Sequence, residues 1–292
     1  MKNDRKHAYL LMLHHRKDLV DLLLEELDDE RNDLYIHIDP FSKDLNIDDL
    51  NIKKSKVYEV EPMKVNWGDF SQIECELRLM KKAGQNGPYA YYHFMQGSSF
   101  PLKNQDEIHK FYDDNQGKQF ISIDDYKVFK FRVNQYNFMA NGKWVANLNM
   151  ALVKIQQLLG INRLKKYNLT YAKGFALWSI TDDLLKYILS KEELINDLFK
   201  YSLCGDEIFI HTLTYNSDFK ENIYCYGQRF TSCMWASTWE IESDFNQERK
   251  AHNFKYEDLE YLMKQNANFA RKFEGEDGLR LIKEIKRIIH EQ

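Results

Sequence analysis

Hydrophobic residues follow two different periods near the start of the chain. Residues 8–13 (AYLLML) are continuously apolar, as expected for a parallel strand that is covered on both faces. Residues 18–29 place four leucines on one helical face, and residues 34–39 (LYIHID) form a second apolar run. A strand, a helix and a strand in this order predict a parallel sheet and an α/β fold.

The later hydrophobic pattern continues this alternation. Strands are predicted over residues 56–60, 90–97, 120–124 and 170–180, and helices over 65–83, 145–159, 181–190 and 206–217. Gly160 is expected to close the second of these helices and Thr181 to cap the third. Residues 98–112 read as a loop followed by a helix, residues 126–141 as strand or loop, and the tail from Tyr256 as helical with a break at 275–278. The chain has no repeat and no Pro- or Gly-rich linker, which indicates a single domain over 1–292.

Composition excludes several classes of protein. Apolar residues make up 43% and charged residues 29%, as in ordinary globular proteins, and a net charge of −4 gives no reason to expect a nucleic-acid partner. Aromatic residues reach 14%, which suits stacking on sugars or bases. An AT-rich genome, whose codons favour Tyr and Phe, would give the same excess.

Cysteine spacing and segment length bear on the compartment. Cys75, Cys204, Cys225 and Cys233 form no CxxC or Cys/His cluster, so free thiols in a reducing compartment are predicted. The apolar run at 8–13 is too short for a signal peptide or a membrane span, and no later segment is long enough. We expect a soluble, cytoplasmic protein.

Polar residues follow the first two predicted strands. His14 and His15 follow the first strand, and Asp39 ends the second. In parallel sheets ligands bind at the carboxyl ends of the strands, so these side chains are candidates for a ligand site. A single His at such a position is more often packed and hydrogen-bonded than catalytic. The first strand is not followed by G-x-G-x-x-G, which argues against dinucleotide binding.

Six segments, in order, resemble one family. They are LLMLHHRKDLVDLLLEELDDERNDLYIHID, VNWGDFSQIECELRLM, YYHFMQGSSFPLKNQDEI, KGFALWSITDDLLKYIL, DEIFIHTL and NFARKF. This series resembles the core-2/I-branching β-1,6-N-acetylglucosaminyltransferase family, which includes the peptide O-xylosyltransferases, over most of residues 8–274. The resemblance implies a GT-A-like fold with a donor-binding half at about 1–125, an acceptor-binding and catalytic half at about 126–274 and a terminal helix at about 277–292.

The family also implies an inverting mechanism with a catalytic carboxylate. Glu207, in DEIFIHTL, matches the family's catalytic glutamate, which would take the proton of the acceptor hydroxyl. A carboxylate at the start of a helix can instead act as a cap, and Asp206 suits that role better.

Basic side chains replace a metal ion in this family. Lys272, in FARKF, and Arg249 match the positions that neutralise the leaving diphosphate. The sequence around Arg249 matches poorly, so Lys250 or Arg271 are alternatives. The donor loop has Ser99 where many relatives have Asp, and no D-x-D motif is present there, so no metal or other cofactor is expected.

The remaining family positions concern the nucleoside and the acceptor. Met12 and Asp39 align with residues near the nucleoside, and His14 is expected to line the same pocket. Trp235 aligns with a Trp that stacks on the acceptor, although Trp239 competes for that role.

The predicted activity is therefore transfer of a sugar from a UDP-sugar to a hydroxyl group of a glycan. UDP-GlcNAc is the first expected donor, with UDP-xylose and UDP-galactose as alternatives. A bacterial enzyme acting on glycan or lipid-linked saccharide acceptors, with peripheral membrane association, fits the lack of an anchor. The competing interpretation is a non-catalytic nucleotide- or carbohydrate-binding protein that retains the fold.

Overall fold

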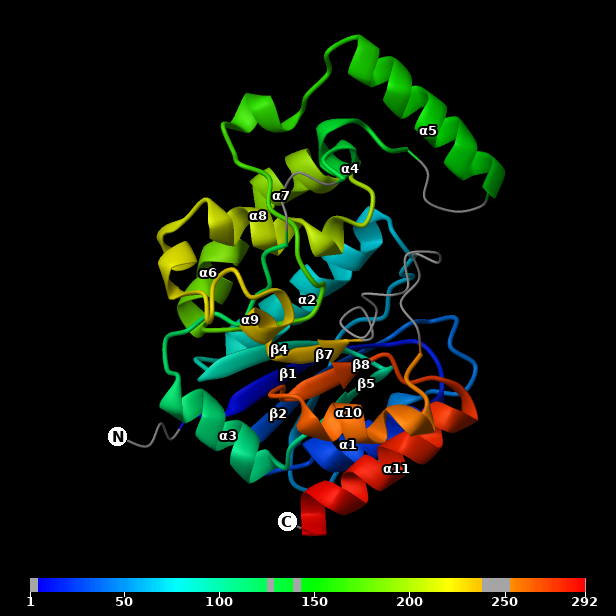
Figure 1. Cartoon of the computed structure of the whole chain (residues 1–292), viewed down its shortest axis with the longest axis vertical. Helices are drawn as coiled ribbons and strands as arrows, with labels where there is room; N and C mark the ends of the chain where they lie inside the picture. The colour runs from blue at the N-terminus through cyan, green and yellow to red at the C-terminus, as the bar shows by residue number, and fades with distance from the viewer. Residues whose placement is uncertain (1–4, 125–128, 139–142, 238–252, 292) are drawn as a thin grey trace.

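A mainly parallel sheet forms the centre of the computed structural model, which describes residues 5–124, 129–138, 143–237 and 253–291 (Figure 1). Its strands are β1 (His7–Leu13), β2 (Asn32–Ile38), β3 (Lys56–Glu59), β4 (Tyr91–Gln96) and β6 (Trp178–Ile180). They are ordered β3-β2-β1-β4-β6, and β6 runs antiparallel to β4 while the other neighbours are parallel. The predicted α/β class is confirmed.

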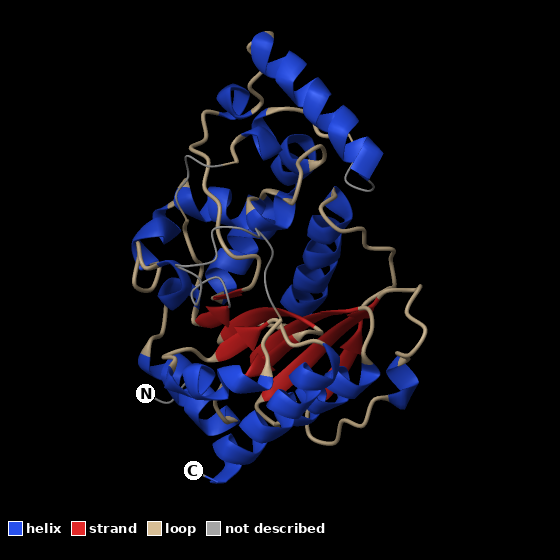
Figure 2. Cartoon of the chain, turned by 45° about the vertical axis from the view of Figure 1, so that its right-hand side comes forward, coloured by secondary structure: helices blue, strands red, loops and turns tan. Residues whose placement is uncertain are grey.

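Helices cover both faces of this sheet, as Figure 2 shows. The helices are α1 (Lys17–Leu27), α2 (Phe70–Asn86), α3 (Gln105–Asp114), α4 (Phe131–Asn134), α5 (Lys143–Leu158), α6 (Asp182–Ser190), α7 (Glu192–Phe199), α8 (Phe209–Tyr215), α9 (Arg229–Cys233), α10 (Leu259–Lys264) and α11 (Gly275–Glu291). Helix α2 packs on β1, β2 and α6, whereas α1 packs against α11. The core therefore lies in two layers, one on each side of the sheet.

The local sequence explains the best-defined elements. Every residue of β1 is buried, which fits its continuous apolar run. Helix α1 buries Leu19, Leu23 and Leu27 on one side. Thr181 caps α6 by accepting a hydrogen bond from the backbone N–H of Leu184, and Gly160 follows α5 with a φ of 70°. Both predicted helix boundaries are confirmed.

A second, three-stranded sheet was not predicted. It consists of β5 (Ser99–Pro101), β8 (Phe269–Arg271) and β7 (Trp235–Ser237), ordered β5-β8-β7. The prediction of a loop at the start of 98–112 and of helix through NFARKF is wrong at these residues. Three-residue strands carry too short a pattern to be recognised, and here each forms through a partner far away in the chain.

Other predicted elements are shorter than expected. Residues 120–124 contribute a single bridge from Phe120 to Ser179, and only the last three residues of 170–180 are strand. The predicted helix at 206–217 is interrupted, because a 3₁₀ turn at Gly205–Glu207 precedes Ile208 and α8. In the tail, the break lies at 265–274, and Gly275 begins α11 rather than interrupting it.

Helices α4, α5 and α7 lie together at one end of the molecule, at the top of Figure 1, while α11 runs beside α1 at the opposite end. None of the four cysteines, all of which lie in the described ranges, forms a disulfide, as predicted. Within the described ranges, none of the helices combines the length and the apolar character needed to cross a bilayer.

Candidate functional site

The order of the strands creates a topological switch point at the carboxyl-terminal edge of the central sheet. The chain passes from β1 to β2 and β3 on one side, and β4 then returns to the other side of β1. Ligands of open α/β sheets bind at the carboxyl ends of strands at such a switch point. The residues that follow β1, β2 and β4 here are His14, Asp39 and Gly97.

Asp39 holds two loops together at this edge. Its Oδ1 accepts a hydrogen bond from the backbone N–H of Phe41 (2.9 Å), and its Oδ2 accepts one from that of Val65 (3.0 Å). Each carboxylate oxygen has a second lone pair, which leaves Asp39 able to accept a further bond. Met12 lies in β1 between His37 and Gln96 and is 8% exposed, so it can contribute packing more than polar contact.

The rings of His14 and His15 are in contact at the end of β1, with centroids 4.0 Å apart and planes inclined by 51°. His14 is exposed, yet the surrounding protein lowers its pKa to about 4, mainly by desolvation and then through His15. His15 Nε2 lies 3.6 Å from Glu274 Oε2. His14 is therefore a neutral side chain at the site near pH 7, suited to hydrogen bonding and stacking rather than to charge.

Two consecutive basic residues lie where β8 ends. Lys272 is partly exposed, and its Nζ is 3.4 Å from Oε1 of Glu274. Arg271 donates from Nε to Ser98 Oγ (3.4 Å), and it pairs in register with Ser99 of β5. Arg249, predicted to act with Lys272, lies outside the described residues, as do the alternatives Lys250 and Trp239.

Arg271 connects the strand ends to the predicted base. Burial lowers its pKa, and the charges of Asp206, Glu274 and Glu207 act in the opposite direction. Among the described residues, no carboxylate lies within ion-pair distance of its guanidinium group. Arg271 thus lies at the end of β8, next to Ser98 and near the charges of Asp206, Glu274 and Glu207, and of the two alternatives to Arg249 it is the one within the described residues.

Glu207 is held by two cations on one carboxylate oxygen. Its Oε2 is 2.7 Å from Arg132 Nη1 and 3.2 Å from Lys173 Nζ, while Lys173 also contacts Asp124 Oδ2 at 3.4 Å. The other oxygen, Oε1, accepts no hydrogen bond from the described part of the chain, and the side chain is 33% exposed. One oxygen is therefore fixed and the other can face a substrate.

Asp206 does not cap a helix, which corrects the sequence prediction. It lies within the 3₁₀ turn, and the N-cap of α8 is Ile208, which has no side-chain capping bond. The Asp206 carboxyl is buried and accepts a hydrogen bond from Gln72 Nε2 (3.2 Å). Burial raises its pKa to about 7, with a further contribution from Glu207. Glu76 lies one turn after Gln72 in α2. Burial raises its pKa, and the charge of Asp206 raises it further.

Two segments noted in the sequence position Glu207. The backbone O of Gly68, in VNWGDF, accepts a hydrogen bond from Cys204 N (2.8 Å). The backbone N–H of Gly174, in KGFALWSI, donates to Glu207 O (3.0 Å). A Cβ at Gly174 would lie 2.1 Å from Ser122 O, so a glycine is required for this close approach. The glycine backbones of these two motifs therefore help to position Glu207.

Trp235 occupies a different environment from the one predicted. It is 1% exposed in β7, and its ring packs on Phe269 (5.1 Å between centroids) and Phe175 (6.0 Å). A ring covered on this scale presents no open face to a sugar, so the structure gives no support to the stacking of Trp235 on the acceptor, which stays a prediction.

Sequence reasoning missed three residues at this site. Arg132 and Lys173 hold Glu207. In the sequence, however, a basic residue on a short helix or an extended segment that pairs with a carboxylate looks the same as one exposed to solvent. Trp67 is 71% exposed and lies between Val65, bonded to Asp39, and Gly68, bonded to Cys204. An exposed Trp between the two halves of the site indicates a binding role, because large aromatic side chains usually lose most of their exposure on folding.

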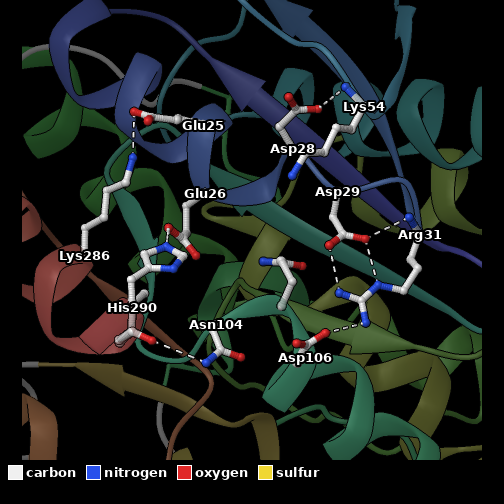
Figure 3. A pocket seen from close by; sticks show the side chains of 12 residues that line it. Glu25, Glu26, Asp28, Asp29, Arg31, Lys54, Asn104, Asp106, Lys286 and His290 are labelled. Atoms are coloured by element: carbon white, nitrogen blue, oxygen red, sulfur yellow. Dashed lines mark hydrogen bonds and ion pairs between the residues drawn. The ribbon is translucent and has the colours of Figure 1, made fainter. Parts of the chain in front are cut away.

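A cavity of about 500 Å³ opens at the opposite, amino-terminal edge of the sheet (Figure 3). Its charged side chains are paired with one another: Arg31 with Asp29 and Asp106, and Lys286 with Glu25. Because most of these charges are already paired, the cavity is a poorer candidate than the strand ends. Among the described residues, no group of three or more His, Cys, Asp or Glu side chains is arranged to hold a metal ion.

The chain was compared with known proteins in three ways. The solved structures include a match to mouse xyloside xylosyltransferase 1 in its apo form, with 12% sequence identity, a TM-score of 0.38 and coverage of 90% of this chain and 96% of that one. No curated protein sequence matches the chain. The model of the Core-2/I-Branching enzyme family matches residues 7–263. The chain therefore belongs to the Core-2/I-branching enzyme family, a family of glycosyltransferases.

Proposed function

We propose that the protein is an inverting glycosyltransferase that moves a sugar, first of all GlcNAc, from a UDP-sugar to a hydroxyl group of a glycan or lipid-linked saccharide. The observation that carries this proposal is the state of Glu207. Two cations fix its Oε2, and its Oε1 is left for an acceptor. Such positioning is what a general base requires and is not needed in a protein that only binds sugars.

The reaction would be a single in-line displacement. The acceptor oxygen bonds to the anomeric carbon as the bond from that carbon to the diphosphate oxygen breaks. The acceptor proton passes to Oε1 of Glu207, and UDP leaves with the electron pair of the broken bond. Arg132 and Lys173 would keep Glu207 aligned through the step, because a small displacement of a catalytic group is costly to the rate.

The donor would lie across the carboxyl ends of β1, β2 and β4. Asp39 would accept a hydrogen bond from the nucleoside, Met12 and His14 would line its pocket, and Trp67 would offer an aromatic face. Arg271 and Lys272 would offset the charge of the leaving diphosphate. This arrangement needs no metal ion, because two side chains supply the positive charge.

A donor screen tests this proposal. Purified protein is incubated with UDP-GlcNAc, UDP-xylose or UDP-galactose and a panel of saccharide acceptors, and released UDP is measured with and without EDTA. We expect acceptor-dependent UDP release that chelation leaves unchanged. Loss of release in EDTA, with recovery in manganese, would contradict metal independence. Release from none of the three donors would contradict the proposed donor class.

A companion binding measurement tests the role of Lys272. Calorimetry with UDP should show roughly 10–100-fold weaker binding for Lys272→Met, because a hydrogen bond to a charged group contributes about 1.5–3 kcal/mol. Uridine, which has no phosphate, should bind both proteins equally. Lys264→Met, on exposed α10, is the matched control. An equal loss for uridine would mean that Lys272 supports the fold and not the diphosphate.

A further inference from the structure

One stretch of the chain has a charge balance unlike that of the whole. Residues 126–181 contain nine Lys and Arg and no Asp or Glu, whereas the complete chain has 41 basic against 45 acidic residues. The stretch includes α4 and α5, at the end of the molecule furthest from α11 in Figure 1. Arg132, Lys166 and Lys173 are ion-paired with carboxylates of other segments and Arg163 is buried, whereas Lys130, Lys154 and Lys165 are exposed. Exposed lysines without acidic residues nearby in the sequence favour an anionic partner.

Helix α5 is mounted with its polar side toward the protein. Asn149 and Gln156 are buried on its inner side together with Val153. Asn149 Oδ1 accepts a hydrogen bond from Phe138 N (3.1 Å), and Gln156 bonds both the N–H and the carbonyl of Tyr136 (2.8 and 2.9 Å). The polar side chains therefore attach the helix to residues 134–138, which is the reverse of an ordinary surface helix.

The outer side of α5 is apolar and exposed. Ile155 is 53% exposed, Leu158 88% and Leu159, just after the helix, 72%. Leu148 and Leu152 extend the same side at helical spacing and are also exposed. We call these five residues the outer face. A contiguous exposed face of this kind marks an interaction site, because folding alone would bury it.

Exposed lysines lie close to the outer face along the chain. Lys154, on α5, and Lys165, in the following turn, are both exposed. Arg163 is instead buried, with its guanidinium over the ring of Tyr136. An amphipathic helix with bulky aliphatic residues on one side and lysines at its border is typical of helices that lie in the interface of a membrane.

We propose that the outer face of α5 binds the surface of an anionic lipid bilayer, with the leucine and isoleucine side chains inserted and the lysines on the headgroups. The occupant is a membrane rather than a second copy of the chain, because the exposed Lys154 and Lys165 of a second copy would repel those of the first, whereas anionic headgroups would attract them. This binding does not depend on the proposed sugar transfer.

The same end of the molecule carries the candidate base. Arg132, which contacts Glu207, lies in α4, and its backbone O accepts a hydrogen bond from Leu203 N (2.9 Å). Arg163 N donates to Asn134 O (2.9 Å), which joins the turn after α5 to α4. These bonds connect α5 through α4 to Glu207, so a bilayer bound to α5 would lie at the end of the molecule that holds the candidate base. Under the proposed function, a lipid-linked acceptor would have to reach this base.

Vesicle flotation tests membrane binding directly. The full chain is mixed with vesicles of phosphatidylcholine alone or of equimolar phosphatidylcholine and phosphatidylglycerol, at low and high salt. We expect flotation with the anionic vesicles at low salt and little with neutral ones. The triple variant Ile155→Ser, Leu158→Ser, Leu159→Ser should bind the vesicles at least roughly tenfold more weakly than wild type, since these exposed residues supply the apolar area that inserts. Circular dichroism checks that it remains folded.

Charge-reversal variants provide matched controls. Lys154→Glu with Lys165→Glu should reduce flotation roughly tenfold or more, whereas Lys53→Glu with Lys110→Glu, exposed lysines elsewhere, changes the net charge equally and should leave it nearly unchanged. Equal flotation of the triple variant and the wild type would overturn the proposal. So would wild-type protein that fails to float, or a wild-type dimer in light scattering that the triple variant converts to a monomer.

Discussion

Asp206 and Glu207 are neighbours in sequence but lie in opposite environments. Glu207 is one-third exposed and ion-paired with Arg132 and Lys173, whereas Asp206 is buried beside Gln72 and Glu76. From sequence, either residue could have been the base or a cap. Their separation depends on the turn at 205–207, which directs one side chain outward and the other into the core.

The buried position of Asp206 predicts a pH effect on stability. A carboxyl group whose pKa rises to about 7 on folding contributes stability below its unfolded pKa, and that contribution is lost as the pH rises toward 7. Asp206→Asn removes this effect while keeping an acceptor for Gln72. Relative to wild type, the variant should gain about 2–3 kcal/mol in free energy of unfolding between pH 5 and pH 8, measured by urea titration. An unchanged difference across this range would show that Asp206 ionises normally.

The segment around Lys173 and Gly174 shows how one element serves the site. It was predicted as a strand, but Gly174 lies against Ser122 and His211, and its N–H donates to Glu207 O. Gly174→Ala would place a Cβ 2.1 Å from Ser122 O, so the backbone must shift. We expect a loss of about 3 kcal/mol in stability, near the upper end for overpacking.

Gly160→Ala is the control for that substitution. Gly160 also has special geometry, with a φ of 70°, but nothing lies near its missing Cβ. It should cost about 1 kcal/mol, from backbone strain alone. Thermal unfolding of both variants would give the comparison. Equal losses would mean that close packing at Gly174 is not what requires glycine.

At the scale of helices and strands, sequence patterns predicted the elements that are formed by interactions between neighbouring residues. The β1–α1–β2 unit, the cap at Thr181 and the end of α5 at Gly160 follow from neighbouring residues, and each is confirmed. β5 and β8 could not be predicted, since their pairing partner lies far away in the chain. For the same reason the contact of Arg132 with Glu207, and the burial of Trp235, were not visible in the sequence.

At the scale of the whole molecule, buried histidines make stability sensitive to acid. Desolvation, followed by the charge of Arg31, lowers the pKa of His109 to about 4; desolvation and then Lys173 lower that of His211 to about 3. Burial also lowers the pKa values of His7 and His93, which share a hydrogen bond of 3.0 Å. The unfolded chain binds more protons at these histidines than the folded protein does. The free energy of unfolding therefore decreases as the pH falls below about 6.5.

His109→Gln isolates one of these contributions. Glutamine can still donate to Asn32 Oδ1, the partner of His109 Nε2, but does not titrate. On going from pH 7.5 to pH 5, wild type should lose about 2 kcal/mol more free energy of unfolding than the variant. Asp206→Asn changes the pH dependence of the free energy of unfolding in the opposite direction, so each variant is a control for the other. Parallel losses in wild type and His109→Gln would contradict the burial of a neutral ring.

The central claim is that Glu207 accepts the proton of the acceptor hydroxyl. Its most direct test is the kcat of Glu207→Gln for UDP release, with a donor and acceptor that wild type turns over, beside the Kd for UDP. The amide keeps the shape of the side chain but cannot take the proton, so we predict a kcat lower by roughly 10²–10⁴-fold with nearly unchanged UDP affinity. A kcat close to that of wild type in a folded Glu207→Gln protein would contradict the account.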